Sequence, residues 1–423
     1  MDRNTVIGFV LLGLLFIGYI FYNSEGKQAL EKQQRHVQDS IDRLKPKRDT
    51  SLNTTKVIKD LSSQDSGEAN IKQDTSGKEE FFTLENKVLK ITFTNKGGQP
   101  KKVELKNFKT FDNKPLILLD GNLSNISYTI NAGNNQTAQT SDLLFSSTGS
   151  QKSADGKETI SFNLQSKDGQ KIEHQYILSP DDYMIGFNIS LNGVNKLITQ
   201  NTLNLTWQSK ADKQEKDIQW ETQQSHIDYV ENGDYDFERL AEGKSDKKRL
   251  DKPVDWVALK QQFFASSIVS KNKFEDAELN WEAPSDTGLH VIATLTANLR
   301  IKVPEGRDAL IPLQLFYGPG DYKILKSYDN QMYNMVPLGS GIFAFVKYIN
   351  RGFVMPVFNF LSGKIASFGL IIALLTIVIR LLISPLTYQS YLSGAKMKLL
   401  KPEIDALKAK YGDDKQAFGM EQM

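Results

Sequence analysis

The chain has 423 residues, 39% hydrophobic and 24% charged, and is long enough for more than one folded unit. Its 52 Lys and Arg nearly balance its 50 Asp and Glu, which argues against direct binding of nucleic acid. The absence of cysteine excludes disulfides, thiolate nucleophiles, zinc–thiolate sites and a lipid-modified cysteine.

The chain begins with an uncharged apolar run that is long enough to cross a bilayer as a helix. The run is TVIGFVLLGLLFIGYIFY, residues 5–22, and the NSEGKQ that follows offers no small-residue site for signal peptide cleavage. We therefore expect a retained transmembrane anchor at 1–22. Residues 23–78 are rich in Lys, Gln, Asp, Ser and Thr, a composition that buries too little apolar surface to fold, and they predict a flexible polar tether.

From residue 79 the hydrophobic pattern changes to an alternation of period two, which is typical of strands with one buried face. Examples are VLKITFT, ISYTIN, YMIGFNISLN and LNLTWQS, with NKGG and SPDD as turns between strands. The pattern predicts a large, mainly antiparallel β domain over 79–335, with a short helix at 321–335. The number of strands favours a two-sheet sandwich over a small barrel.

Three segments follow the β domain. Residues 341–361 are rich in aromatic side chains but contain charges and Pro356, which favours a helix on the membrane surface; a core helix of the β domain is the alternative. Residues 365–386 predict a second transmembrane helix. Residues 389–423 predict the start of a coiled-coil hairpin, because apolar residues recur there at steps of three and four, namely Met397, Leu400, Ile404, Leu407 and Tyr411.

Charge at the end of the second apolar segment predicts the orientation in the membrane. Lysines crowd its C-terminal side and favour a cytoplasmic location there, which places the β domain outside the cytoplasm; they are Lys396, Lys398, Lys401, Lys408 and Lys410. The return arm of the hairpin has about two turns in which to cover the seam, so we expect the sequence to be a piece of a longer protein.

Arg380 interrupts the second apolar segment, and Thr376 and Ser384 lie four residues to either side of it. Residues at this spacing share one face of a helix. Two interpretations stay open. Arg380 could extend its guanidinium to the headgroups, or the three side chains could line a hydrated groove that attracts an acidic or polar peptide.

Signals for an enzyme are few. The histidines, His36, His174, His226 and His290, form no metal-binding sequence pattern. Gly243-Lys244-Ser245 lacks the earlier glycine of a phosphate loop, and the basic stretch GKSDKKRLDK predicts a solvated loop. We expect no catalytic residue, metal or cofactor.

The stretch IRLLISPLTYQSYLSGAKMKLLKPEIDALKAKYGDDKQ, residues 379–416, resembles the YidC family of membrane protein insertases, in its Gram-negative form. The opening MDRN and FYGPGDY at 316–322 also fit this family. The resemblance implies a periplasmic β-supersandwich domain, an interfacial helix, a cytoplasmic hairpin and a bacterial inner membrane location with the N-terminus in the cytoplasm. It also implies that Arg380 and Thr376 face a hydrophilic groove, and it names nascent membrane proteins, the Sec translocon and the ribosome as partners.

Two functions from different classes remain. The first is an insertase and chaperone that performs no covalent chemistry; the family's later membrane helices are missing from this sequence, so we expect it to be a fragment. The second is a membrane-anchored sandwich that binds or isomerises a carbohydrate. The coiled-coil seam and the polar side chains around Arg380 favour the insertase, because a simple anchor needs neither.

Overall fold

The computed structural model describes residues 77–411, except 122, 134–135, 167–168, 286–289 and 340–342. The predicted anchor at 1–22, the predicted tether up to residue 76 and the predicted return arm of the hairpin from residue 412 lie outside the described residues.

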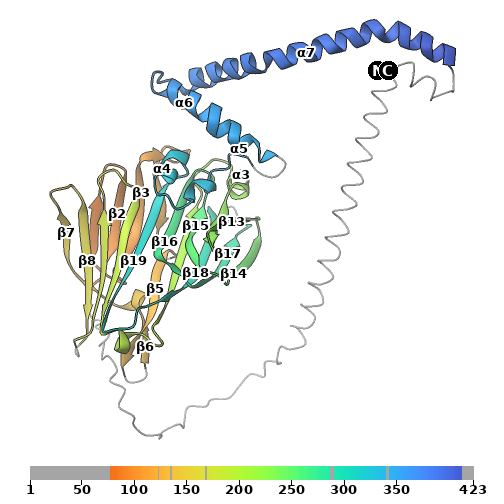
Figure 1. Ribbon diagram of the computed structural model, residues 1–423. Helices are drawn as coiled ribbons and strands as arrows, with labels where there is room; N and C mark the ends of the chain where they lie inside the picture. The colour runs from red at the N-terminus through yellow and green to blue at the C-terminus, as the bar shows by residue number, and fades with distance from the viewer. Residues whose placement is uncertain are drawn as a thin grey trace. The chain divides into compact units, whose positions relative to one another are not determined.

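The described strands form three antiparallel sheets (Figure 1). The four-stranded sheet consists of β1 (Phe81–Glu85), β2 (Leu89–Thr94), β3 (Gln99–Lys109) and β4 (Pro115–Asp120), in that order. The nine-stranded sheet has the order β13 (Asp234–Arg239), β12 (His226–Glu231), β15 (Val254–Lys260), β16 (Phe264–Phe274), β19 (Asp308–Pro319), β10 (Met184–Asn192), β9 (Lys171–Leu178), β8 (Glu158–Gln165) and β7 (Ser146–Lys152). The six-stranded sheet has the order β14 (Lys244–Leu250), β17 (Asp276–Ala283), β18 (Val291–Lys302), β11 (Thr202–Asp212), β5 (Asn125–Gly133) and β6 (Gln136–Gln139).

The nine-stranded sheet packs against the other two, so that the β domain is a two-layer sandwich. Strand β16 contacts β18 of the six-stranded sheet and β4 of the four-stranded sheet, and β19 contacts β3. Buried side chains from all three sheets form one hydrophobic cluster. In β9, β10 and β11 buried and more exposed residues alternate along the strand, because successive side chains point to opposite faces of a sheet. The predicted large β domain is therefore confirmed.

The basic stretch GKSDKKRLDK is not the solvated loop that its sequence predicts. Most of it is strand β14, which lies at the edge of the six-stranded sheet and, among the described strands, pairs with β17 alone. Six of its seven residues are exposed or half-buried. Lysines on an edge strand discourage pairing with another chain, so a lysine-rich sequence suits this position.

Short helices connect the strands or follow the last one. They are η1 (Thr140–Asp142), α2 (Val194–Leu197), α3 (Ile218–Gln223), α4 (Tyr322–Lys326) and the 3₁₀ turn η3 (Met332–Met335). The sequence predicts one helix at 321–335, whereas the structure has α4 and η3 with a turn between them. The indole N–H of Trp256 in β15 donates to the carbonyl oxygen of Asn330 at 2.7 Å, which holds this turn against the sheet. The backbone of Asp329 and Gln331 has positive φ, which is incompatible with a continuous helix.

The predicted surface helix at 341–361 consists of α5 (Val346–Ile349), the π-helical turn η5 (Asn350–Val354) and α6 (Met355–Ser362). Helical structure continues through Pro356. Pro356 lies in the first turn of α6. This first turn directly follows the π-helical turn η5; π-helical turns and prolines both mark places where the regular i→i−4 hydrogen bonding of a helix is interrupted.

The last element, α7 (Phe368–Tyr411), is one helix of 44 residues. The sequence predicts two helical segments here, 365–386 and another from 389. Instead Pro385 and Pro402 both lie inside α7. Within the described part of the chain, α7 is the one helix that is long and apolar enough to cross a membrane.

Candidate functional site

The candidate site lies on one face of the apolar part of α7. Thr376, Arg380 and Ser384 follow one another at intervals of four residues and are all exposed. Among the described residues, no carboxylate or carbonyl pairs with the Arg380 guanidinium. The structure therefore places the three predicted residues on one helix face.

Only Arg380 has hydrogen-bond donors left over. The Thr376 hydroxyl donates to the carbonyl oxygen of Ile372 at 2.8 Å. The Ser384 hydroxyl donates to the carbonyl oxygen of Leu381 at 2.9 Å. In an unbroken helix that carbonyl would accept from the N–H of residue 385, and proline has none. Ser384 thus replaces the missing donor, as hydroxyls do around prolines in membrane helices.

The charge pattern along α7 sets Arg380 apart. It is the only charged side chain between Lys364 and Lys396 in the sequence. With a rise of 1.5 Å per residue, its Cα lies about 18 Å along the helix from Phe368. The hydrocarbon core of a bilayer is about 30 Å thick, so a helix that crosses it from Phe368 carries Arg380 within the core. A charge at such a depth costs several kcal/mol unless water, protein or headgroups receive it.

A second cationic feature was not singled out by sequence reasoning. Arg351, in η5, lies over the rings of Tyr322 and Tyr333, with its Cζ atom 5.2 Å and 5.3 Å from the ring centroids. The two rings meet edge to face at 5.7 Å. Arginine and tyrosine are residue types that form cation–π contacts, but these three residues are too far apart in the sequence for the contact to be predicted from it.

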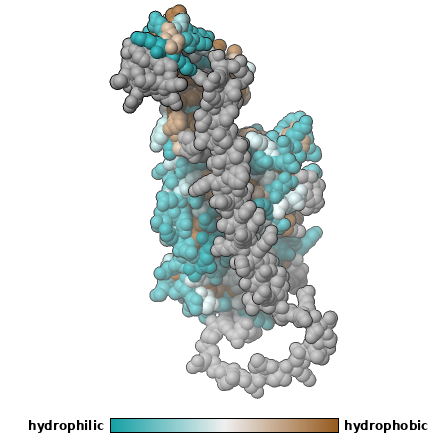
Figure 2. Space-filling view, turned by 90° about the vertical axis from the view of Figure 1, so that its right-hand side faces the viewer, coloured by the Kyte–Doolittle hydropathy of each residue, from teal (hydrophilic) through white to brown (hydrophobic). Residues whose placement is uncertain are grey.

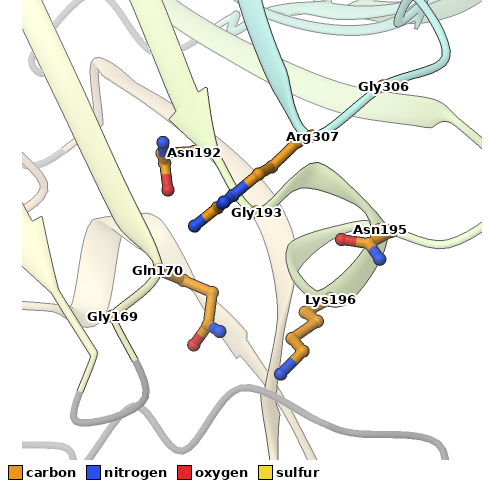
Figure 3. Close-up of a pocket in the computed structure, with 8 residues that line it drawn as sticks. All are labelled: Gly169, Gln170, Asn192, Gly193, Asn195, Lys196, Gly306 and Arg307. Carbon is orange, nitrogen blue, oxygen red and sulfur yellow. The ribbon is translucent and has the colours of Figure 1, made fainter.

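The β domain has a polar pocket of about 400 Å³ at the turns that follow β8, β10 and β18 (Figure 3). Arg307 and Gln170 extend toward one another in it, and Asn192, Asn195 and Lys196 also line it. The described residues that line it include no carboxylate and no histidine.

The described histidines are structural or exposed. His174 is buried; its Nδ1 lies 3.1 Å from the carbonyl oxygens of Gly97 and Gly98, and its Nε2 lies 2.8 Å from the Tyr128 hydroxyl. Carbonyls only accept, so Nδ1 carries the proton and Nε2 accepts from Tyr128. Burial lowers the pKa of His174 to about 4. His290 is exposed, and His36 lies outside the described residues.

A buried polar cluster in β12, β13 and β15 also satisfies itself. The Asp228 carboxylate accepts from the Tyr235 hydroxyl and lies 3.3 Å from Nδ1 of His226. Lys260 Nζ donates to the carbonyl oxygen of Gln224 at 3.1 Å, and burial lowers its pKa. Among the described residues, no group of three or more His, Asp or Glu could hold a metal ion.

Comparison with known proteins decides the family. The model of the YidC periplasmic domain matches residues 82–350, and that of the 60Kd inner membrane protein matches residues 360–423. A protein of Parabacteroides distasonis named "Membrane protein insertase YidC" is 32% identical over 440 residues, which is 98% of this chain and 68% of that protein. The chain belongs to the YidC family of membrane protein insertases. A relative from Porphyromonas gingivalis with the same name is 33% identical over 99% of this chain and 68% of its own length.

Family membership confirms the insertase interpretation of the sequence, and the carbohydrate alternative is not favoured. The β domain is also similar to solved structures of another class. One is a galactose mutarotase-like protein from Lactobacillus casei, with 10% identity and a TM-score of 0.37, covering 56% of this chain and 100% of that one. A likeness at this score carries no argument about function.

The inner membrane family supports a location in the bacterial inner membrane. Its match begins in α6 and covers all described residues of α7, including Arg380. The hydrophilic surface of the β domain on the face seen in Figure 2 suits a domain in water rather than in lipid.

Proposed function

We propose that Arg380 is the fixed positive charge of a hydrated groove through which this YidC family member helps new membrane proteins enter the inner membrane. The observation that carries the proposal is the contrast on one face of α7. The hydroxyls of Thr376 and Ser384 donate to their own helix, whereas the guanidinium of Arg380 donates to no described residue.

The chemistry of such a groove needs no covalent step. A polar segment that crosses the bilayer loses its hydration, and water together with a fixed cation in the membrane lowers that cost. A guanidinium stays charged at any physiological pH, so its attraction for a carboxylate does not depend on proton uptake. Acidic segments should therefore gain most from the groove.

The proposal includes a topology. The lysines of the C-terminal part of α7 lie in the cytoplasm, α7 crosses the membrane near Arg380, and the β domain lies in the periplasm; the supporting lysines are Lys396, Lys398, Lys401, Lys408 and Lys410. The helix from Val346 to Ser362 then lies at the periplasmic surface of the membrane. The N-terminal anchor at 1–22 crosses from the cytoplasm, and the Sec translocon and the ribosome are proposed partners on the family resemblance.

Charge substitution at Arg380 tests the function. In the full-length protein, reconstituted in liposomes, Arg380→Ala should slow insertion of a substrate with an acidic translocated tail by roughly ten-fold, as expected from losing one charge-assisted contact of about 1.4 kcal/mol. Arg380→Lys should keep most of the rate, because long-range attraction needs the charge and not the fork geometry.

A matched substrate and a matched variant serve as controls. For a substrate tail whose acidic residues are changed to Asn or Gln, the insertion rates of the unchanged protein and of Arg380→Ala should differ less. Thr376→Ala removes a hydroxyl that already bonds to Ile372, and should change the rate little. Insertion of the acidic substrate at the normal rate by a folded Arg380→Ala protein would leave Arg380 as a residue that only reaches toward headgroups.

A further inference from the structure

The ring contacts of Arg351 leave its hydrogen-bonding edge unused. Tyr322 and Tyr333 engage the guanidinium through cation–π contacts at 5.2 Å and 5.3 Å. These contacts orient the cation but occupy none of its five N–H donors. No described residue accepts a hydrogen bond from them or forms an ion pair with Arg351. The guanidinium is thus fixed in position and ready to donate.

A pocket of about 560 Å³ lies beside this guanidinium, between α4 and the helix formed by α5, η5 and α6. Two further cations line it, Lys323 and Lys326, together with the amide of Asn359. Among the described residues that line it there is no carboxylate. Three positive charges around one cavity repel one another in the absence of an anion, so the pocket favours an anionic ligand.

The nearest acidic residue in sequence is already engaged. The side-chain Oδ1 of Asp321 accepts from the backbone N–H groups of Lys323 and Ile324 at 2.8 Å and 3.0 Å, and so caps α4. Lys326 lies over the Tyr322 ring at 5.8 Å, which brings a second cation to the ring that holds Arg351. Within the described residues, no salt bridge neutralises the three cations.

The surroundings of the pocket point to the class of anion. The helix that carries Arg351 exposes large aromatic side chains, namely Phe345 (59% exposed), Tyr348 (68%) and Phe360 (62%). Exposed aromatic residues together with cations are typical of a helix that lies at the boundary between headgroups and acyl chains. A phosphate held beside such a surface would be that of a lipid, whose acyl chains would meet the aromatic side chains.

We propose that Arg351, Lys323 and Lys326 bind the phosphate of an anionic phospholipid at the periplasmic surface of the membrane. This inference rests on the proposed topology, which places the helix from Val346 to Ser362 at that surface. The bound lipid joins α4 of the β domain to the surface helix, because α4 supplies the lysines and η5 supplies the arginine. The β domain is thereby coupled to the bilayer near α7.

Native mass spectrometry of the whole chain in an uncharged detergent measures the binding. Phosphatidylglycerol is the probe, with phosphatidylcholine as the neutral lipid and inorganic phosphate as the free anion. We expect one tightly bound phosphatidylglycerol and weaker binding of phosphatidylcholine. Arg351→Gln and Lys326→Gln should each weaken phosphatidylglycerol binding about five-fold, the effect of one basic residue on an anionic lipid.

Lys347→Gln is the matched control. Lys347 precedes Arg351 by about one turn and lies over the Tyr348 ring at 5.2 Å, but it does not line the pocket. Its substitution should leave the affinity for the single lipid unchanged. Lys326→Gln keeps the surface helix intact, so weaker binding by that variant is independent of any change in helix packing caused by Arg351→Gln.

Several results would overturn the proposal. Equal binding of phosphatidylcholine, equal loss in Lys347→Gln, or unchanged binding in both pocket variants would each exclude a specific anionic lipid site. Displacement of the lipid by inorganic phosphate at similar concentrations would assign the pocket to a free anion instead. If the lipid does not bind but Arg380→Ala still slows insertion, the lipid site is wrong and the proposed function stands. If the lipid binds as expected but Arg380→Ala inserts at the normal rate, the proposed function is wrong and the lipid site stands.

Discussion

The hydroxyl of Ser384 donates to the carbonyl oxygen of Leu381 at 2.9 Å, at the point in α7 where Pro385 removes a backbone donor. A carbonyl without a donor costs about 1 to 3 kcal/mol when it is buried, and water cannot compensate for it in the hydrocarbon core. The pair gives the Leu381 carbonyl a donor where the backbone supplies none. It also gives Ser384 a role within the helix.

Substitution of Ser384 distinguishes this role from contact with a substrate. Ser384→Ala leaves the Leu381 carbonyl without a donor and should increase amide hydrogen exchange around residues 381–389 of α7. Adding Pro385→Ala supplies a backbone N–H for the same carbonyl and should restore protection, together with any lost insertion rate. A loss of insertion in Ser384→Ala that the double variant does not recover would mean that the hydroxyl meets the substrate.

Thr387 provides the control for that experiment. Its hydroxyl donates to the carbonyl oxygen of Ile383 at 3.1 Å, in the same region of α7. Unlike the Leu381 carbonyl, this acceptor keeps a backbone donor, the N–H of Thr387 itself. Thr387→Ala should therefore change exchange and insertion much less than Ser384→Ala.

Cysteine labelling tests the proposed topology, and the chain contains no cysteine of its own. Lys247 in β14 and Lys401 in α7 are both exposed. A cysteine at Lys247 should react in intact cells with a reagent that enters the periplasm but not the cytoplasm. A cysteine at Lys401 should react only after the inner membrane is opened. The reverse pattern would place the β domain in the cytoplasm.

His174 predicts how the stability of the β domain depends on pH. Its pKa is lowered from 6.5 to about 4 by burial, so below pH 6.5 the unfolded state binds a proton that the folded state does not. The stabilisation is complete above pH 6.5 and is lost progressively as the pH falls toward 4. The unfolding free energy should lose about 2.5 kcal/mol from this residue between pH 7.5 and 4.5.

Urea unfolding followed by tryptophan fluorescence measures this loss, since every tryptophan of the chain lies in the β domain, at positions 207, 220, 256 and 281. His174→Gln keeps an amide donor for the Gly97 and Gly98 carbonyls but cannot titrate. The variant should be less stable at neutral pH and less sensitive to acid. If both proteins lose the same unfolding free energy in acid, a group other than His174 controls the pH dependence of stability.

Local pattern was sufficient for a large part of the fold. The period-two alternation of β9, β10 and β11 appears as alternating burial, because a strand buries every second side chain whichever sheet it joins. The apolar run of α7 and the charge of Arg380 within it are likewise visible in the sequence, since length, hydropathy and a single charge need no tertiary partner. The stretch 379–416 indicated the family, which the comparisons confirmed.

Tertiary structure decided the features that depend on residues distant in the sequence. The lysine-rich stretch of β14 becomes a strand because β17 supplies its hydrogen-bond partners. The cation of Arg351 is oriented by Tyr322 and Tyr333, which precede it in separate elements. The donor that the Leu381 carbonyl receives next to Pro385 depends on the rotamer of Ser384, which local composition does not specify. Hydrophobic periodicity predicts which side chains are buried. Hydrogen bonds and ring contacts instead depend on residues that come together only when the chain folds.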